Sequence, residues 1–114
     1  PILVVGGSAR TFLGEYMAGG LLVVLGLDGA MDARGIGSGI HGGEIIIRGN
    51  VDDACLAAGA KKVPLTDEDR KRIAPVIREF AGDFGLDPEP LLNADYTRIV
   101  PASARPFAGK YTWE

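Results

Sequence analysis

The chain has 114 residues, of which 46% are hydrophobic and 24% are charged, and its formal net charge is −3. This length suits one domain, and the lack of a basic stripe in the sequence argues against nucleic acid as a partner. The single cysteine excludes an internal disulfide and favours a reducing, cytoplasmic location, while the longest apolar run, Met17 to Leu27, is too short for a membrane span.

Short apolar runs alternate with glycines in residues 1–60. The runs are Ile2–Val5, Leu21–Leu25 and Glu44–Arg48, and each is closed by a glycine, at Gly6, Gly26 and Gly49. Such runs indicate strands, and closing glycines 20 and then 23 residues apart are typical of a stacked solenoid. We therefore expect an all-β fold, a right-handed single-stranded parallel β-helix of about two to three visible coils with a helical C-terminal cap.

One phrase occurs twice, as GEYMAGGLLVVLG from Gly14 and as GSGIHGGEIIIRG from Gly37. Glycine at a sharp corner permits positive φ or a close approach of two backbones. We expect such backbone at Gly20, at Gly43 or at both. The glycines predicted to be structural are Gly14, Gly19, Gly20, Gly26, Gly35, Gly37, Gly39, Gly42, Gly43 and Gly49.

The closing glycines also predict a register. Aligning them stacks Ile2, Leu22 and Ile45, and likewise Val4, Val24 and Ile47, which we expect to form the solenoid interior. The other face carries Leu21, Val23 and Leu25, which should be buried against a helix, and Glu44 and Arg48, which should stay near solvent. The bare edge of the first strand should be covered by further coils, another chain or the C-terminal segment.

Residues 61–114 carry helix signals and form the C-terminal helix and capping tail of the same domain. Thr66 and Asp69 predict a capping box, and an apolar stripe follows, which consists of Ile73, Val76, Ile77, Phe80 and Phe84. Pro75 should kink or split this helix, and Gly82 and Gly85 mark its end. A helical turn at 87–93 and a strand at 96–100 are expected next. In the tail, Tyr111 and Trp113 suggest docking.

Four features allow a chemical interpretation. Gly37, Gly39 and Gly42 spell a dinucleotide-binding pattern, but a strand follows them where a helix is required. His41, the only histidine, lacks partners for a zinc or triad site and fits a turn residue better. Cys55 lies near acids and fits an inert buried thiol. Pro1 could act as a general base, because an N-terminal proline is a nucleophilic secondary amine. PILVV also resembles the first strand of the tautomerase superfamily, but that fold needs a long helix directly after this strand, and here Gly6, Gly7 and another strand follow.

The stretch GIGSG, Gly35–Gly39, followed by IHGGEIIIRG resembles the GXGXG domain, the C-terminal β-helix of the glutamate synthase large subunit. This domain also occurs as a separate archaeal-type subunit. The likeness extends over nearly the whole chain, including the helix at TDEDRKRIAPVIREFAGDFG and the strand at YTRIVPAS. The family's β-helix has more coils than this chain can form, so the chain is either a fragment or relies on coils from a partner.

The resemblance implies a non-catalytic structural role. In glutamate synthase one part hydrolyses glutamine and another, with FMN and iron–sulfur clusters, reduces 2-iminoglutarate, while the β-helix holds them in register. We therefore expect no catalytic, cofactor-binding or metal-binding residue in this chain. The expected partners are other domains or subunits of glutamate synthase, and the chain could also form a homo-oligomer. We expect it to bind neither nucleic acid nor a membrane. The alternatives are a scaffold subunit of formylmethanofuran dehydrogenase or N-methylglutamate synthase, and a small enzyme that uses Pro1 or His41.

Overall fold

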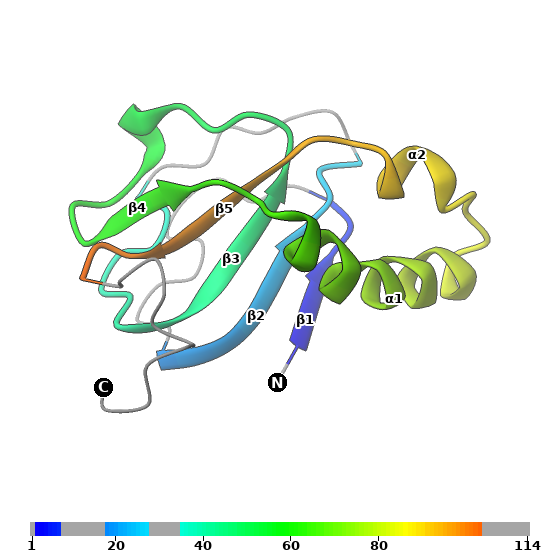
Figure 1. Ribbon diagram of the computed structural model, residues 1–114, viewed down its shortest axis with the longest axis horizontal. Coiled ribbons are helices and arrows are strands. Elements are labelled where there is room, and N and C mark those ends of the chain that lie inside the picture. Colours follow the sequence, from blue (N-terminus) through cyan, green and yellow to red (C-terminus); the bar gives the residue numbers. More distant parts are fainter. Residues whose placement is uncertain (1, 8–17, 28–34, 104–114) are drawn as a thin grey trace.

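The computed structural model describes residues 2–7, 18–27 and 35–103 (Figure 1). The elements in chain order are β1 (Ile2–Val5), β2 (Ala18–Val24), β3 (Gly42–Arg48), the 3-10 helix η1 (Asp53–Cys55), β4 (Ala60–Val63), α1 (Asp67–Asp83), α2 (Glu89–Leu92) and β5 (Tyr96–Pro101). These strands belong to one sheet, so both halves of the chain contribute to the same core.

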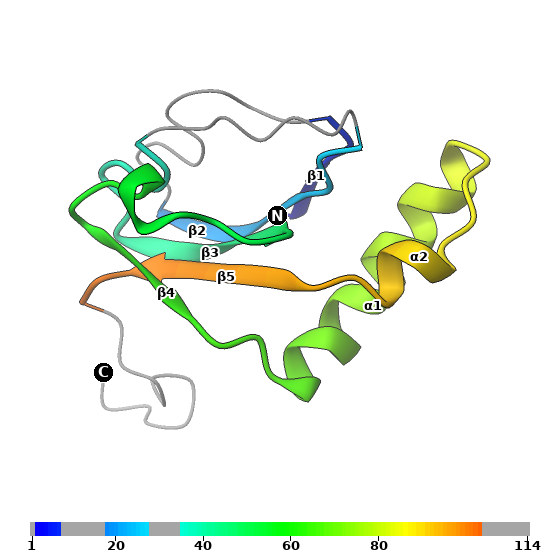
Figure 2. The same ribbon diagram turned by 90° about the horizontal axis from the view of Figure 1, so that it is seen from above.

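The sheet has five strands in the order β1-β2-β3-β5-β4, with β1 and β4 at its edges (Figure 2). The first three strands are parallel, but β5 is antiparallel to both β3 and β4. The predicted parallel β-helix is therefore wrong: the described residues form an open, mixed sheet with two helices. The glycine spacing correctly predicted three neighbouring parallel strands, but it contains no information about the strands after residue 60, which pair in the opposite sense.

The predicted register is right between β2 and β3 and wrong between β1 and β2. Leu22 lies opposite Ile45 as expected, whereas Ile2 lies opposite Leu21 and not Leu22. A slip of one residue moves every side chain of a strand to the other face. Gly6 has no positive φ, and a Cβ added there would lie 2.7 Å from the Phe80 ring. Gly6 thus serves close packing against α1 and is not equivalent to the corner glycine Gly26, whose φ is 59°.

Helix α1 begins and ends with the predicted signals. The Thr66 hydroxyl accepts a hydrogen bond from the Asp69 N–H at 3.1 Å, and the Asp69 carboxylate accepts from the Thr66 N–H at 2.9 Å, so the capping box is confirmed. At the other end Gly85 has a φ of 65°, and the N–H of Leu86 bonds the carbonyl of Ala81 at 2.8 Å. Pro75 lies inside α1 without splitting it.

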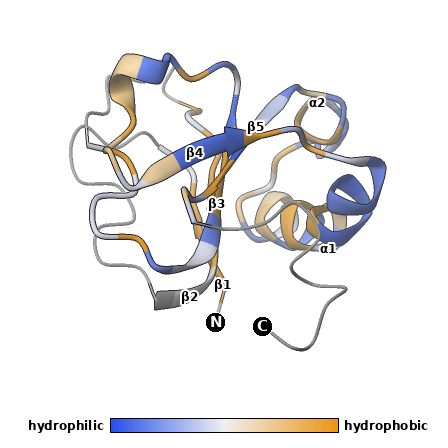
Figure 3. Ribbon diagram, turned by 60° about the vertical axis from the view of Figure 1, so that its left-hand side comes forward, coloured by the Kyte–Doolittle hydropathy of each residue, from blue (hydrophilic) through white to orange (hydrophobic). Residues whose placement is uncertain are grey.

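The helices cover one face of the sheet, and the apolar side of α1 faces it (Figure 3). The expectation for Leu21, Val23 and Leu25 is confirmed, since all three are buried in one cluster with this helix. The buried members of that cluster are Leu21, Val23, Leu25, Ile46, Ile73, Ile77, Leu91 and Tyr96. The last residue of the predicted stripe, Phe84, is 67% exposed, so the packed stripe ends one turn earlier than expected.

A second apolar cluster lies on the opposite face of the sheet. Its buried members are Leu22, Val24, Ile36, Ile40, Ile45, Ile47, Val51 and Ile99. Four of the six residues predicted as interior are among them, but Ile2 is 60% exposed and Val4 packs on the helix side. Both exceptions follow from the shifted register of β1.

Candidate functional site

Two glycine pairs, Gly19-Gly20 in β2 and Gly42-Gly43 in β3, lie next to each other where the two strands begin to pair. Gly20 has a φ of 84° and Gly43 a φ of 75°, so the prediction of positive φ is confirmed at both positions. A Cβ at Gly43 would lie 2.7 Å from the carbonyl carbon of Gly19 and 2.9 Å from the oxygen of Gly20. This position therefore requires glycine for two reasons: its backbone is left-handed, and backbone atoms of β2 occupy the space that a side chain would need.

A second group of glycines shapes the turn before β3. Gly35, Gly37 and Gly39 have φ values of 65°, 78° and 70°, and tight turns place Ile36 and Ile40 in the core. Ile36 also pairs with Leu56 in a parallel bridge. Because the GxGxxG pattern continues into β3, it offers no helix N-terminus to a pyrophosphate.

The other glycines predicted to be structural differ in their φ values and in the space around them. Gly26 and Gly49 have φ values of 59° and 95°, and an added Cβ would have no neighbour within 4 Å at either position. Gly19 and Gly42 do not have positive φ, and Gly14 lies outside the described residues.

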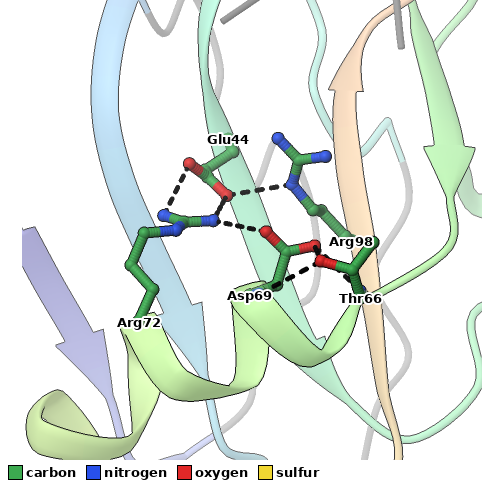
Figure 4. Close-up of polar contacts among 5 residues, drawn as sticks. All are labelled: Glu44, Thr66, Asp69, Arg72 and Arg98. Carbon is green, nitrogen blue, oxygen red and sulfur yellow. Dashed lines mark hydrogen bonds and ion pairs between the residues drawn. The ribbon is translucent and has the colours of Figure 1, made fainter. Parts of the chain in front are cut away.

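The most connected polar group lies between the sheet and α1 and consists of Glu44, Thr66, Asp69, Arg72 and Arg98, here called the Glu44 cluster (Figure 4). Both guanidinium nitrogens of Arg72 bond the Glu44 carboxylate, at 2.9 and 2.7 Å, and Arg98 reaches it at 3.0 Å. Arg72 also bonds Asp69 at 2.9 Å. Two carboxylates and two guanidinium groups therefore join β3, β5 and the first turns of α1.

The charges of the Glu44 cluster stabilise one another. Partial burial of Asp69 opposes its ionisation, but hydrogen bonds from the Thr66 N–H and the Arg72 guanidinium outweigh this, so the pKa of Asp69 is lowered. The hydrogen bond to Glu44 raises the pKa of Arg72. With its acceptors already engaged, the cluster is suited to clamping the helix onto the sheet.

Sequence reasoning missed this cluster because it expected Glu44 to stay near solvent. The side chain of Glu44 is only 17% exposed. One signal was present in the sequence: a carboxylate within an apolar strand needs partners when a helix covers that face. The partners, Arg72 and Arg98, lie 28 and 54 residues further along the chain, and no local spacing connects them to Glu44.

Arg48 was also expected near solvent and is instead partly buried. Its guanidinium donates to the carbonyl oxygens of Leu25 at 2.5 Å and Gly26 at 3.2 Å. These bonds join the end of β3 to the end of β2, where the ladder stops and backbone acceptors would otherwise need water.

Of the residues considered for catalysis, the structure describes His41 and Cys55. His41 is exposed, and its Nδ1 lies 3.1 Å from the carbonyl of Gly39 in the same turn. Cys55 is half-buried at the end of η1, and Pro1 lies outside the described residues. Within residues 2–7, 18–27 and 35–103, no three His, Cys, Asp or Glu side chains are placed to hold a metal ion. No helix in that same part of the chain is long and apolar enough to cross a membrane.

The described glycine pairs lie between parallel strands, and the charges of the Glu44 cluster join α1 to the sheet. Residues 1–103 match the family described as the GXGXG motif, and the chain belongs to that family. The chain is 46% identical to protein MJ1350 of Methanocaldococcus jannaschii, over 121 aligned residues that span 98% of this chain. It covers 46% of that relative, so it spans about half the relative's length. No solved structure matches.

Proposed function

We propose that the chain is a non-catalytic structural domain or subunit of glutamate synthase. It would hold the amidotransferase part and the part that carries FMN and iron–sulfur clusters together. The observation that supports this proposal is the match of residues 1–103 to the GXGXG motif family. In this proposal FMN and the clusters belong to the partner parts, and the chain itself binds no cofactor.

Two features of the structure suit such a role. The Glu44 cluster and the Arg48 bonds fix α1 and the strand ends to one another, which gives a rigid block. Among the described residues, β1 is an edge strand that pairs with β2 on one side, and its Leu3 side chain is 61% exposed. An open apolar strand edge is a surface on which another polypeptide can add a strand.

Co-expression with the amidotransferase and FMN/iron–sulfur polypeptides of a split glutamate synthase tests the proposal. The chain should elute with both on gel filtration, and Leu3→Asp should weaken this association by placing a charge on the contact edge. Ala58→Asp, at an exposed turn far along the chain, is the matched control and should elute as the unmodified chain does. The proposal fails if the chain elutes alone, or if it associates instead with polypeptides of formylmethanofuran dehydrogenase or N-methylglutamate synthase.

A further inference from the structure

A groove lies between α1 and α2, which are neighbours in the helical layer over the sheet (Figure 2). It has a volume of about 390 Å³, and its lining residues belong to these two helices. The floor is apolar and consists of Ile73, Ala74, Pro75, Ile77 and Leu92. Because Ile73 and Ile77 are also members of the buried cluster beneath α1, this α1–α2 groove borders the hydrophobic core.

The rim of the α1–α2 groove is basic and consists of Arg70, Lys71 and Arg78. Arg70 is held in place, since its guanidinium donates to the carbonyl oxygen of Ala94 at 3.0 Å and lies 3.9 Å from the Asp95 carboxylate. Lys71 is exposed and lies 3.6 Å from Glu68. Such a surface pair contributes little stability and can exchange its partner for another carboxylate.

Arg78 has no carboxylate partner within the part of the chain that the structure describes. Its side chain is exposed. The positions one helical turn away on α1 are occupied by Ala74, Pro75, Ala81 and Gly82, none of which is acidic. A carboxylate from outside the described residues can therefore pair with Arg78 without breaking an existing ion pair.

We propose that the α1–α2 groove binds a short acidic segment of a partner polypeptide. An apolar side chain of this segment lies on the floor, and carboxylates on either side of it pair with Lys71 and Arg78. Complementary charge supports this choice, because the rim carries three cations around an apolar floor. Lys71 and Arg78 are seven residues apart on α1, or about 10 Å along the helix axis, which sets the separation of the two carboxylates.

A second copy of the chain and a nucleic acid both complement the groove less well. Two copies related by a two-fold axis at this groove would bring their basic rims together, and juxtaposed like charges oppose association. A nucleic acid needs a longer basic surface, whereas this rim surrounds an apolar floor on a chain of net charge −3. The chemistry of the acidic segment follows from the groove alone and does not depend on the proposed function.

Selection from a random peptide library tests the proposal without knowledge of the partner. Peptides are recovered that bind the immobilised chain and do not bind the Arg78→Glu variant. They should contain an apolar residue flanked by aspartate or glutamate. A labelled synthetic peptide of the most enriched sequence should bind the unmodified chain saturably in fluorescence anisotropy, with an affinity that falls as salt is added.

Variants that played no part in the selection then locate the peptide. Lys71→Glu, at the other end of the rim, should weaken binding by about tenfold or more. Lys61→Glu makes the same charge change on β4 and should leave the affinity unchanged. Ala74→Leu should weaken binding by filling the floor, whereas the same change at the exposed Ala58 should not. Circular dichroism checks that each variant is folded.

A charge exchange separates pairing at the rim from general effects on the fold. A peptide with lysine in place of its acids should bind the double variant Lys71→Glu with Arg78→Glu more tightly than it binds the unmodified chain. The proposal is overturned if no peptide depends on Arg78, or if Lys71→Glu and Lys61→Glu act equally. It is also overturned if Ala74→Leu leaves the affinity unchanged, or if an oligothymidylate competes as well as the acidic peptide, since charge alone would then account for binding.

Discussion

Gly43 offers the most direct test of why the glycine pair is needed. Gly43→Ala adds one carbon at a position with a φ of 75°, where that carbon would lie 2.7 to 2.9 Å from backbone atoms of Gly19 and Gly20. The left-handed conformation alone costs about 1–2 kcal/mol for a residue with a Cβ. The overlap adds about 1–3 kcal/mol, since the atoms it meets are backbone atoms of a paired strand and cannot rotate away.

We therefore expect Gly43→Ala to lower the free energy of unfolding by about 2–5 kcal/mol. Gly49→Ala isolates the conformational part, because its φ is 95° but no atom lies within 4 Å of the added carbon. Gly19→Ala has neither feature and should be nearly neutral. Urea unfolding followed by circular dichroism measures the free energy of unfolding of all three variants. Equal dependence of this free energy on urea concentration would show that the same unfolding transition is being compared. If Gly43→Ala costs no more than Gly49→Ala, the close approach of the two strands is not what requires glycine.

Three further predictions concern the packing of α1 on the sheet. Glu44→Gln should destabilise the fold by about 1–3 kcal/mol in urea unfolding, because charge-assisted bonds from two arginines are weakened, and added salt should reduce this difference. The lowered pKa of Asp69 means that its carboxylate stabilises the fold above about pH 4, the unfolded value, and that this contribution is lost as the pH falls through the lower folded pKa. Asp69→Asn should therefore lower the melting temperature at pH 7, and this difference should shrink as the pH falls below about 4. A difference that stays the same as the pH falls would contradict the assignment. Ile77→Ala, at a position 1% exposed, should cost about 2–5 kcal/mol, whereas its exposed neighbour Arg78→Ala should stay within about 0.5 kcal/mol.

Local signals in the sequence predicted most of the elements. The capping box at Thr66, the helix stop near Gly85 and the strand from Tyr96 each depend on neighbouring residues, and each is found where it was expected. The burial of Val23 beneath α1 could also be predicted, because a strand with apolar side chains on both faces must be buried on both faces.

Features that depend on distant residues could not be predicted in this way. The antiparallel pairing of β3 with β5 joins Ile45 to Ile99, and nothing near either residue specifies the partner or its direction. The register of β1, with Ile2 opposite Leu21, was not predicted, and neither was the packing of Gly6 against the Phe80 ring, which joins residues far apart in the chain. β4 was not predicted, since its sequence AKKV is short and half polar, and it forms an edge strand through its pairing with β5.

The glutamate synthase proposal makes one kinetic prediction that separates coupling from chemistry. Glutamate formation should be measured in an assembly of the amidotransferase and FMN/iron–sulfur polypeptides, with and without this chain, using either glutamine or free ammonia as the nitrogen source. A structural domain that holds the two parts in register should be required for glutamine-dependent synthesis and dispensable for ammonia-dependent synthesis. Equal loss of both activities without the chain, or equal retention of both, would contradict the proposed role.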